Sequence, residues 1–342
     1  MASRLRRLVW IVLLSLLGLA AWLGFQARQP GPGTGREVTV RLERGAGVQR
    51  IAEVLSQHGL IRSKLAFMLL ARLPGSGQGL RAGEYQLRDD MSLPAILRLL
   101  RSGRVVQHRF TVPEGSSLRQ VAARLAAFNW LDEGRFLALC RDTSLLAGLG
   151  IEGDSAEGYL YPDTYLLIRD GDDEVSILRR MSSRSHEVWQ QVSAAAAGGS
   201  LDRRQVLTLA SMVEKETGHG PERPLVAGVF LNRLQRGMRL QSDPTVIYGL
   251  EDFDGRLTRN QLNTPSPYNT YTLPALPAGP ICSPGRAALE AVLSPARTDA
   301  LYFVSKNNGT HYFSRDLHEH NQAVRRYQRT EDRGQKTEKG DG

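Results

Sequence analysis

The feature that most constrains this chain is an uninterrupted apolar run close to its N-terminus. Residues Leu8 to Phe25 carry no charge, and Arg4, Arg6 and Arg7 lie directly before them. A run of this length is at the short end of the roughly 20 residues that a membrane-spanning helix needs. Because basic residues stay on the cytoplasmic side, the rest of the chain is expected outside the cytoplasmic membrane, in the periplasm or its equivalent.

A cleaved signal peptide is the alternative for this segment, with Gly18-Leu19-Ala20 as a small-residue cleavage site. The long apolar core, with Trp10 and Trp22 at its two ends, favours a retained single-pass anchor instead. Both interpretations export the body of the protein. No second apolar run of this length follows, so a multi-span membrane protein is not predicted.

Composition is that of an ordinary globular protein, with 41% hydrophobic and 23% charged residues among 342. The formal net charge of +9 raises the question of nucleic acid, but the arginines are scattered. Zinc-finger spacings, RNA-binding signatures and basic-region helices do not occur in the sequence, so no nucleic-acid partner is predicted. A basic surface of this kind suits an acidic polymer or a membrane.

The sequence predicts neither a metal site nor a cofactor. Cys140 and Cys282 are far apart and without a CxxC pattern, which excludes a disulfide framework and a cysteine-based zinc site. A single disulfide between them stays open. The sequence His318-Glu319-His320 would place both histidines on one side only in a strand, and its flanks indicate a helix. The sequence also contains no P-loop, GxGxxG, Ser-His-Asp or Cys-His signature.

Periodicity predicts an α+β fold with several segments. Residues 1–25 form the cytoplasmic stub and anchor, and residues 26–36, rich in Gly and Pro, form a linker. Residues 37–106 form a small α+β domain, residues 107–325 form a larger mixed α/β domain, and the charged residues 326–342 form a disordered tail.

A weak internal repeat runs through the small domain and into the start of the larger one. Each copy is predicted as a short strand, a turn and an amphipathic helix, and the copies begin at residues 40, 85 and 111. Units of this kind resemble the LysM module, which binds glycans containing N-acetylglucosamine. A generic α+β packing domain without sugar affinity is the alternative.

In the larger domain the pattern predicts helices within 131–150 and 171–200, and from Asp202 through Lys215. Pro221 and Pro224 open a further helix that ends at Gly237. Residues 240–285 are predicted as long ordered loops, and residues 301–304 and 311–314 as a hairpin.

Two carboxylates, Glu214 and Glu216, lie at the C-terminal end of the helix that begins near Asp202. Glu216 shares its helix face with apolar residues such as Met212, whereas Glu214 shares a smaller and more polar face. A carboxyl on an apolar stripe loses solvation, so its pKa rises, and the helix dipole acts in the same direction. Such a group can act as a general acid. An ion pair with a neighbouring Lys or Arg is the alternative, and periodicity alone favours it.

The residues around these carboxylates resemble the MltG (YceG-like) family of endolytic murein transglycosylases. The resemblance lies in the run EKETG followed by ERPLVAGVFLNRLQRGMRLQSDPTVIYG, and in EGYLYPDTY, TPSPYNTY and LPAGPICSPG. These blocks occur in the family order and cover most of residues 37–325, and the resemblance implies that residues 107–325 are the YceG-like catalytic domain. In the family the acid/base glutamate precedes a small hydroxyl residue, which implies Glu216 before Thr217 here. Other lytic transglycosylases often have Ser at that place.

The resemblance implies cleavage of nascent peptidoglycan between N-acetylmuramic acid and N-acetylglucosamine, with formation of 1,6-anhydro ends and control of strand length. It also implies neighbouring cell-wall synthases as partners. A hydrolytic muramidase would need a second carboxylate, for which Asp163 and Asp243 are the candidates. A non-catalytic wall-binding scaffold is the alternative from another class.

Substrate-binding residues are expected in the loops of the family blocks and in the tyrosine-rich segment, where rings could stack on sugars. The alternatives are loop scaffolding for Asn and Asp, and a half-buried strand for the tyrosines. The candidates are Asn232, Asp243, Tyr248, Asn269, Tyr271, Tyr159 and Tyr161.

Overall fold

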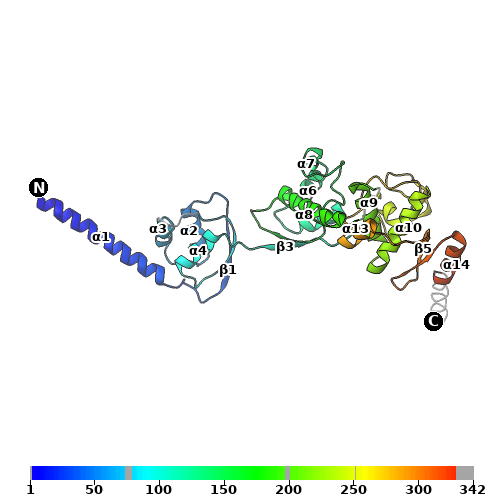
Figure 1. Cartoon of the computed structure of the whole chain (residues 1–342). Helices are drawn as coiled ribbons and strands as arrows, with labels where there is room; N and C mark the ends of the chain where they lie inside the picture. The colour runs from blue at the N-terminus through cyan, green and yellow to red at the C-terminus, as the bar shows by residue number, and fades with distance from the viewer. Residues whose placement is uncertain (1, 74–78, 197–200, 251, 329–342) are drawn as a thin grey trace, which may run out of the picture. The chain divides into compact units, whose positions relative to one another are not determined.

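The computed structural model describes residues 2–73, 79–196, 201–250 and 252–328 (Figure 1). The chain divides into two compact units, the first formed by residues 1–109 and 166–173 and the second by residues 110–165 and 174–342. The sequence places a boundary at 106/107 and gives no sign that residues 166–173 return to the first unit. The fold is α+β, as expected: helices predominate in the described residues, and the strands pair two by two.

The apolar run forms helix α1, Ala2–Arg28. Its stretch Arg4–Arg28 has a mean hydropathy of 2.4 and is long and apolar enough to cross a membrane. The helix continues three residues beyond the expected end of the anchor. The segment predicted as a linker is therefore partly helical, and its Gly35 amide donates a hydrogen bond of 2.7 Å to the Asp89 carboxylate of the first unit.

The predicted strand–turn–helix pattern is confirmed three times along the chain. Strand β1 (Glu37–Leu42) precedes α2 (Val48–Gln57), β2 (Gly83–Arg88) precedes α4 (Leu93–Ser102), and β3 (His108–Thr111) precedes α5 (Leu118–Ala126). Helix α3 (Lys64–Ala71), which the repeat did not predict, follows α2.

The core of the first unit lies between one sheet face and these helices. Strands β1 and β2 are antiparallel, with Val40 opposite Tyr85. Alternate residues point inward, as the period of a strand requires. Val40 and Tyr85 pack with Ile51 of α2, Phe67 of α3 and Ile96 of α4.

The second unit is mainly helical. Its elements are α5, α6 (Glu133–Leu139), α7 (Thr143–Gly148), α8 (Glu174–Ala194), α9 (Arg203–Glu216), the 3₁₀ turn η1 (Gly220–Glu222), α10 (Arg223–Gln235), α11 (Asp243–Tyr248), α12 (Arg259–Asn263), α13 (Arg286–Leu293), β5 (Tyr302–Ser305), β6 (His311–Ser314) and α14 (Leu317–Tyr327). The boundary between the units passes through β3 and its partner β4 (Thr164–Leu167). The prediction that residues 240–285 form only loops is wrong, because α11 and α12 lie among them.

The predicted hairpin is confirmed. Strands β5 and β6 pair antiparallel, with Ser305 opposite His311, and Gly309 in the turn has a φ of 83° that favours glycine. Helix α14 packs on both strands and extends two residues into the region predicted as a tail. Residues 329–342 of that tail lie outside the described residues.

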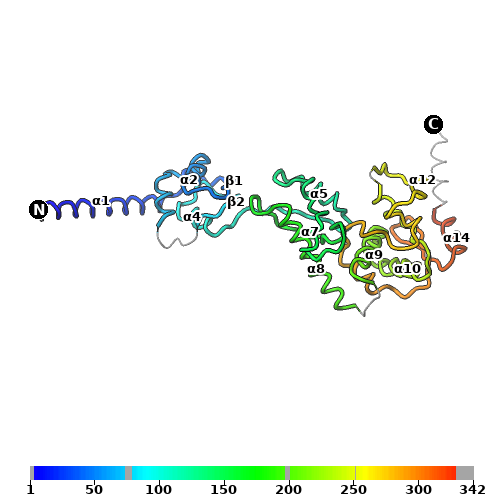
Figure 2. The backbone as a smooth tube through the Cα atoms, turned by 90° about the horizontal axis from the view of Figure 1, so that it is seen from above, coloured from blue at the N-terminus to red at the C-terminus, as the bar shows by residue number. Residues whose placement is uncertain are grey.

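Helix α9 is the central element of the second unit. Every residue from Val206 to Val213 is buried, and α10, α11 and α13 pack around the helix. Figure 2 shows α9 beside α10. The helix begins with a capping box: the Asp202 carboxylate accepts the Gln205 amide at 2.8 Å, and the Gln205 side chain accepts the Asp202 amide at 3.0 Å. A helix buried on all sides holds its last turn in a fixed place.

Replacing Asp202 by Ala should therefore lower the free energy of unfolding of α9 by about 1 kcal/mol, because the Gln205 amide at the helix start loses its acceptor. Asp202→Asn retains an acceptor and should cost only a few tenths. Amide hydrogen exchange within α9 measures both effects. Equal protection in wild type and Asp202→Ala would show that the cap does not stabilise this helix.

Candidate active site

The carboxyl group of Glu216 lies at the last residue of α9, where the buried helix ends. Its Oε1 accepts a short hydrogen bond of 2.5 Å from the Ser242 hydroxyl. The pKa of Glu216 is raised from 4.5 to about 7, mainly by burial. The negative charge of Asp243 contributes to the rise, and the Ser242 hydroxyl and Arg233 oppose it. The group is thus present in both protonation states near neutral pH, as a general acid and base must be.

Glu214 lies two residues before Glu216 in the last turn of α9, but its carboxylate forms an ion pair. Arg223 donates to its Oε1 at 2.7 Å, and the Gly285 amide donates to its Oε2 at 3.0 Å. Its side chain is only 5% exposed. Burial therefore does not separate the two glutamates, although the sequence pattern gave only Glu216 a buried face. The two carboxyl groups differ in their partners: Glu214 forms an ion pair with Arg223, whereas Glu216 accepts a hydrogen bond from the Ser242 hydroxyl.

Arg233 supplies a buried positive charge to the site. Its Nε donates to the Leu301 carbonyl at 2.6 Å, and its Nη1 donates to the Leu240 carbonyl at 2.7 Å. The guanidinium also lies 5.1 Å from the centre of the Tyr302 ring. Because backbone carbonyls and a ring hold it, its charge stabilises an ionised Glu216 from a distance.

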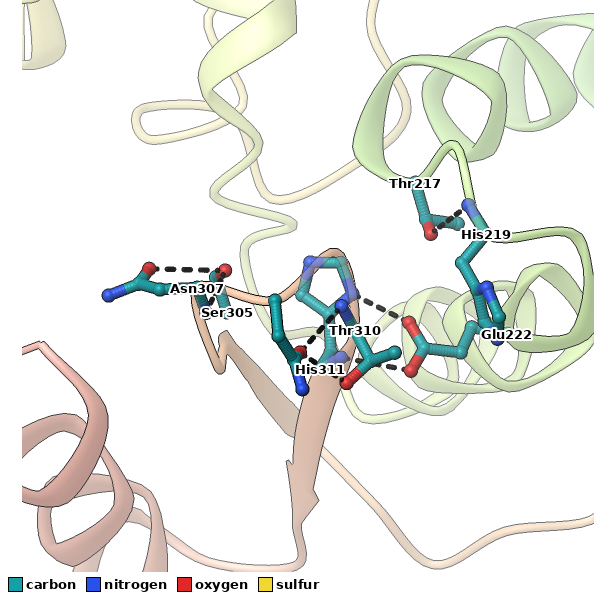
Figure 3. A network of polar contacts seen from close by, with 8 residues as sticks. Thr217, His219, Glu222, Ser305, Asn307, Thr310 and His311 are labelled. Atoms are coloured by element: carbon teal, nitrogen blue, oxygen red, sulfur yellow. Dashed lines mark hydrogen bonds and ion pairs between the residues drawn. The ribbon is translucent and has the colours of Figure 1, made fainter.

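The chain leaves α9 through a fixed turn. Thr217 is buried, and its hydroxyl accepts the His219 amide at 3.0 Å (Figure 3). Three residues later the Glu222 carboxylate accepts the amide of His311 at 2.9 Å and contacts its Nδ1 at 2.7 Å (Figure 3). This pair connects η1 to strand β6, so the segment after Glu216 is held at both ends.

The loop that carries Ser242 is also fixed by hydrogen bonds. Gln241 has a φ of 51°, a strained conformation for a residue with a side chain. The Ser242 amide donates to the Thr270 hydroxyl at 3.0 Å. At the start of α11, Asp243 accepts a 2.5 Å hydrogen bond from the Tyr271 hydroxyl. The structure thus brings the predicted residues Asp243 and Tyr271 close to Glu216.

Two other predicted residues hold the backbone. The Asn232 amide donates to the carbonyls of Thr298 and Ala300 at 2.7 and 3.0 Å. Asn269 is buried, and its side-chain nitrogen donates to three carbonyls between residues 261 and 264. These are the scaffold contacts that the sequence left as the alternative for loop Asn.

The predicted tyrosines are distributed over separate environments. Tyr159 is only 2% exposed, with Arg203 5.3 Å from its ring centre, so its ring is covered. Tyr161 is partly exposed, and Arg184 lies 5.6 Å from its ring centre. Arg184 also pairs with Asp163 at 3.1 Å, which accounts for that carboxylate.

Tyr248 lies in a cavity of about 890 Å³ in the second unit. Its hydroxyl donates to Glu157 at 2.9 Å. Glu157 is 3% exposed and also accepts the Leu118 amide at the start of α5. Burial raises its pKa from 4.5 to about 7. The sequence predicted only tyrosines from the block EGYLYPDTY as site residues and missed Glu157. A carboxylate within an aromatic, turn-rich run was the available signal.

The two cysteines and the histidines of His318-Glu319-His320 make contacts with residues other than Glu216. Cys140 and Cys282 are buried free thiols, which removes the disulfide left open by the sequence. On α14, His320 stacks on Tyr302, while Nε2 of His318 hydrogen-bonds Gln322 at 2.9 Å.

Comparison with known proteins identifies the family. The model of the YceG-like family matches residues 40–326. This chain belongs to the YceG-like family. It is 32% identical over 305 residues to the endolytic murein transglycosylase of Bacillus subtilis strain 168, covering 85% of this chain and 84% of the relative. It is 30% identical to the enzyme of that name from Streptococcus pneumoniae D39, covering 92% of this chain and 64% of the relative.

A crystal structure of a YceG-like protein from Listeria monocytogenes is similar to this one. The TM-score is 0.60 at 30% sequence identity, and the match covers 84% of this chain and 98% of the other. The family expected from the sequence is therefore confirmed, and the mixed fold belongs to it.

Replacing each glutamate by glutamine should change stability in opposite directions. As the pH increases from 4.5 to 7.5, the free energy of unfolding of Glu216→Gln should rise relative to that of wild type by up to about 3 kcal/mol. The folded state holds its proton up to about pH 7, whereas the unfolded state loses it near 4.5, so wild type loses stability across this window.

Glu214→Gln should instead lower the free energy of unfolding by about 2–3 kcal/mol at pH 7.5, because Arg223 loses its buried partner. Hydrogen exchange of α9, corrected for intrinsic rates, measures both variants in the full chain. A loss of stability in Glu216→Gln at pH 7.5 equal to that in Glu214→Gln would show that the carboxylates are equivalent.

Proposed function

We propose that this chain is a membrane-anchored lytic transglycosylase that cuts nascent peptidoglycan within its glycan strands. The bond broken is the β-1,4 bond between N-acetylmuramic acid and N-acetylglucosamine. The product carries a 1,6-anhydro muramyl end, and the cuts limit strand length. The named relatives from Bacillus and Streptococcus support the substrate class.

The single observation that carries the proposal is the state of Glu216. It is a buried carboxyl with a pKa of about 7, bonded by one hydroxyl, at the rigid end of α9. Glu214, its neighbour on the turn, is committed to Arg223 and the Gly285 amide. Glu216 therefore takes the catalytic role.

In the proposed reaction protonated Glu216 gives its proton to the oxygen that bridges the two sugars. The bond from that oxygen to muramic C1 breaks, and positive charge develops at C1. The Glu216 carboxylate then takes the proton from the muramic C6 hydroxyl, whose oxygen bonds to C1. The enzyme regains its proton, and no water is consumed. Arg233 and Ser242 stabilise the ionised carboxylate between the two transfers.

The second candidate function is that of a hydrolytic muramidase. It is favoured by Asp243, a second carboxylate whose negative charge raises the pKa of Glu216. A retaining hydrolase uses a second carboxylate as its nucleophile. Here the Tyr271 hydroxyl engages Asp243 Oδ1, which fits a residue that orients a loop or binds a sugar hydroxyl. A wall-binding scaffold, the third account, gives Glu216 no role.

For the location, we propose that α1 is retained as an anchor, with its N-terminus in the cytoplasm. The helix runs without a break through Gly18 and Ala20, and Trp22 packs against the core of the first unit. The catalytic unit then acts outside the membrane, beside the synthases that supply new strands, and the LysM-like first unit contacts glycan. The intact mass of the protein extracted from membranes tests the anchor.

Product analysis tests the reaction. Full-length protein in detergent micelles, incubated with nascent uncrosslinked strands, should release anhydro-muramyl ends that mass spectrometry detects. Glu216→Gln should lower the rate by at least about 100-fold, since general acid–base catalysis contributes that much or more. Glu152→Gln, an exposed carboxylate change, serves as the control and should leave the rate unchanged.

Reducing ends in place of anhydro ends would convert the proposal to a hydrolase and give Asp243 the second role. Full activity in Glu216→Gln would contradict both enzymatic accounts. Binding of strands without cleavage by wild type would leave the scaffold.

The hydroxyl of Ser242 provides a separate test through pH. Because it donates to the ionised carboxyl, Ser242→Ala should raise the pKa of Glu216 further. The fall in activity on the alkaline side, expected near pH 7 in wild type, should then move up by roughly one unit. A merely structural role would lower the rate without moving the profile. A pH–rate profile that stays in place would therefore contradict the assignment.

A further inference from the structure

A second feature of the catalytic unit is the cavity of about 890 Å³ that contains Tyr248. This volume lies toward the upper end of the range for sites of small ligands. The N-terminal turn of α5, the end of α9 and helix α11 line it. Lys215 and Pro244 of the lining are the chain neighbours of Glu216 and Asp243, so the cavity adjoins the turn and the loop that form the active site.

The charges of the lining are mixed and mainly positive. Arg119, Arg141 and Lys215 are exposed and face this cavity. Among the residues that the structure describes, neither Arg119 nor Arg141 has a carboxylate within salt-bridge distance. Lys215 donates to the Gly115 carbonyl at 3.4 Å. Arginines in such a position favour planar carboxylates, which they bind through two parallel hydrogen bonds.

Two acidic residues complete the lining. Glu157 is bonded inward, to the Leu118 amide and the Tyr248 hydroxyl, so it presents little charge to the cavity. Asp154 is exposed at the rim and could accept an ammonium group. Apolar side chains, among them Leu137 and Ile247, lie between these charges. A neutral sugar is a poor fit, because it carries no anionic group for the three cations. A diphosphate is also a poor fit, because the carboxylate of Asp154 does not attract it.

We propose that this cavity binds the short peptide attached to muramic acid, through its carboxylates. Arg119, Arg141 and Lys215 receive the carboxylates, Asp154 receives an ammonium group of the peptide, and the apolar side chains contact its aliphatic parts. Lys215 lies next to Glu216 in the last turn of α9, so a muramyl residue at the cleaved bond can place its peptide here.

The enzyme would then cut strands that still carry peptides in preference to bare glycan. This inference rests on the proposed function for its meaning, but binding to the cavity can be measured without any cleavage.

The test uses the full chain in detergent micelles and two probes that contain no glycosidic bond. One is N-acetylmuramyl tetrapeptide, and the other is the same compound with its peptide carboxylates converted to amides. Calorimetric titration of wild type should give at least a tenfold lower Kd for the charged probe. Arg119→Gln combined with Arg141→Gln should abolish this preference, and salt should weaken it.

Arg124→Gln is the matched control, because Arg124 is an exposed arginine of the same helix α5 and does not line the cavity. It should leave both Kd values unchanged. Equal Kd values for the two probes in wild type, or an equal loss in Arg124→Gln, would overturn the proposal. Tighter binding of inorganic pyrophosphate than of the charged probe would overturn it as well, in favour of a phosphate site.

The two proposals fail separately. If strands are cut but the probes bind alike, the peptide site is wrong and the lytic function stands. If the charged probe binds as expected but strands are not cut, the site stands and the function is wrong.

Discussion

The pairing of Glu214 with Arg223 is the interaction on which the site depends. Helix α9 is buried along its middle, and the carboxyl groups of both glutamates in its last turn are buried. If both carboxyl groups lacked a cation, burial would raise the pKa of each, and nothing would distinguish a structural carboxylate from a proton donor. Because Arg223 and the Gly285 amide engage Glu214, that residue is a structural link between α9, α10 and the start of α13. Glu216 is left with a hydroxyl and a distant cation, and its proton becomes transferable.

The surroundings of Glu216 are built to hold it still. The Asp202 cap fixes the start of α9, the Thr217 hydroxyl fixes the turn after it, and Ser242 approaches from a loop tied to Thr270. The Glu222–His311 contact fastens the next segment to the hairpin. Catalytic groups act well only when their neighbours set their position, and here backbone amides and hydroxyls do so.

The sequence could predict many of the elements, because they depend on local pattern. The strand–turn–helix repeat predicted β1 with α2 and β3 with α5, and the two short strand segments predicted the hairpin of β5 and β6. The preference for Glu216 over Glu214 rested on the family pattern and on a helix face. The second reason was incomplete, because the side chain of Glu214 is buried too. The deciding partner, Arg223, comes from the next helix, and periodicity cannot place it. The same limit explains Glu157, whose partners Leu118 and Tyr248 are distant in sequence.

The account stands most directly on the protonation of Glu216. Full-length protein labelled with ¹³C at the glutamate side-chain carboxyls can be titrated by NMR, and the Glu216→Gln spectrum identifies the signal of Glu216, separating it from Glu157. The account predicts a midpoint near pH 7 for Glu216. A midpoint near the ordinary 4.5 would mean that the carboxyl is ionised at neutral pH, and it would contradict the assignment of Glu216 as the general acid.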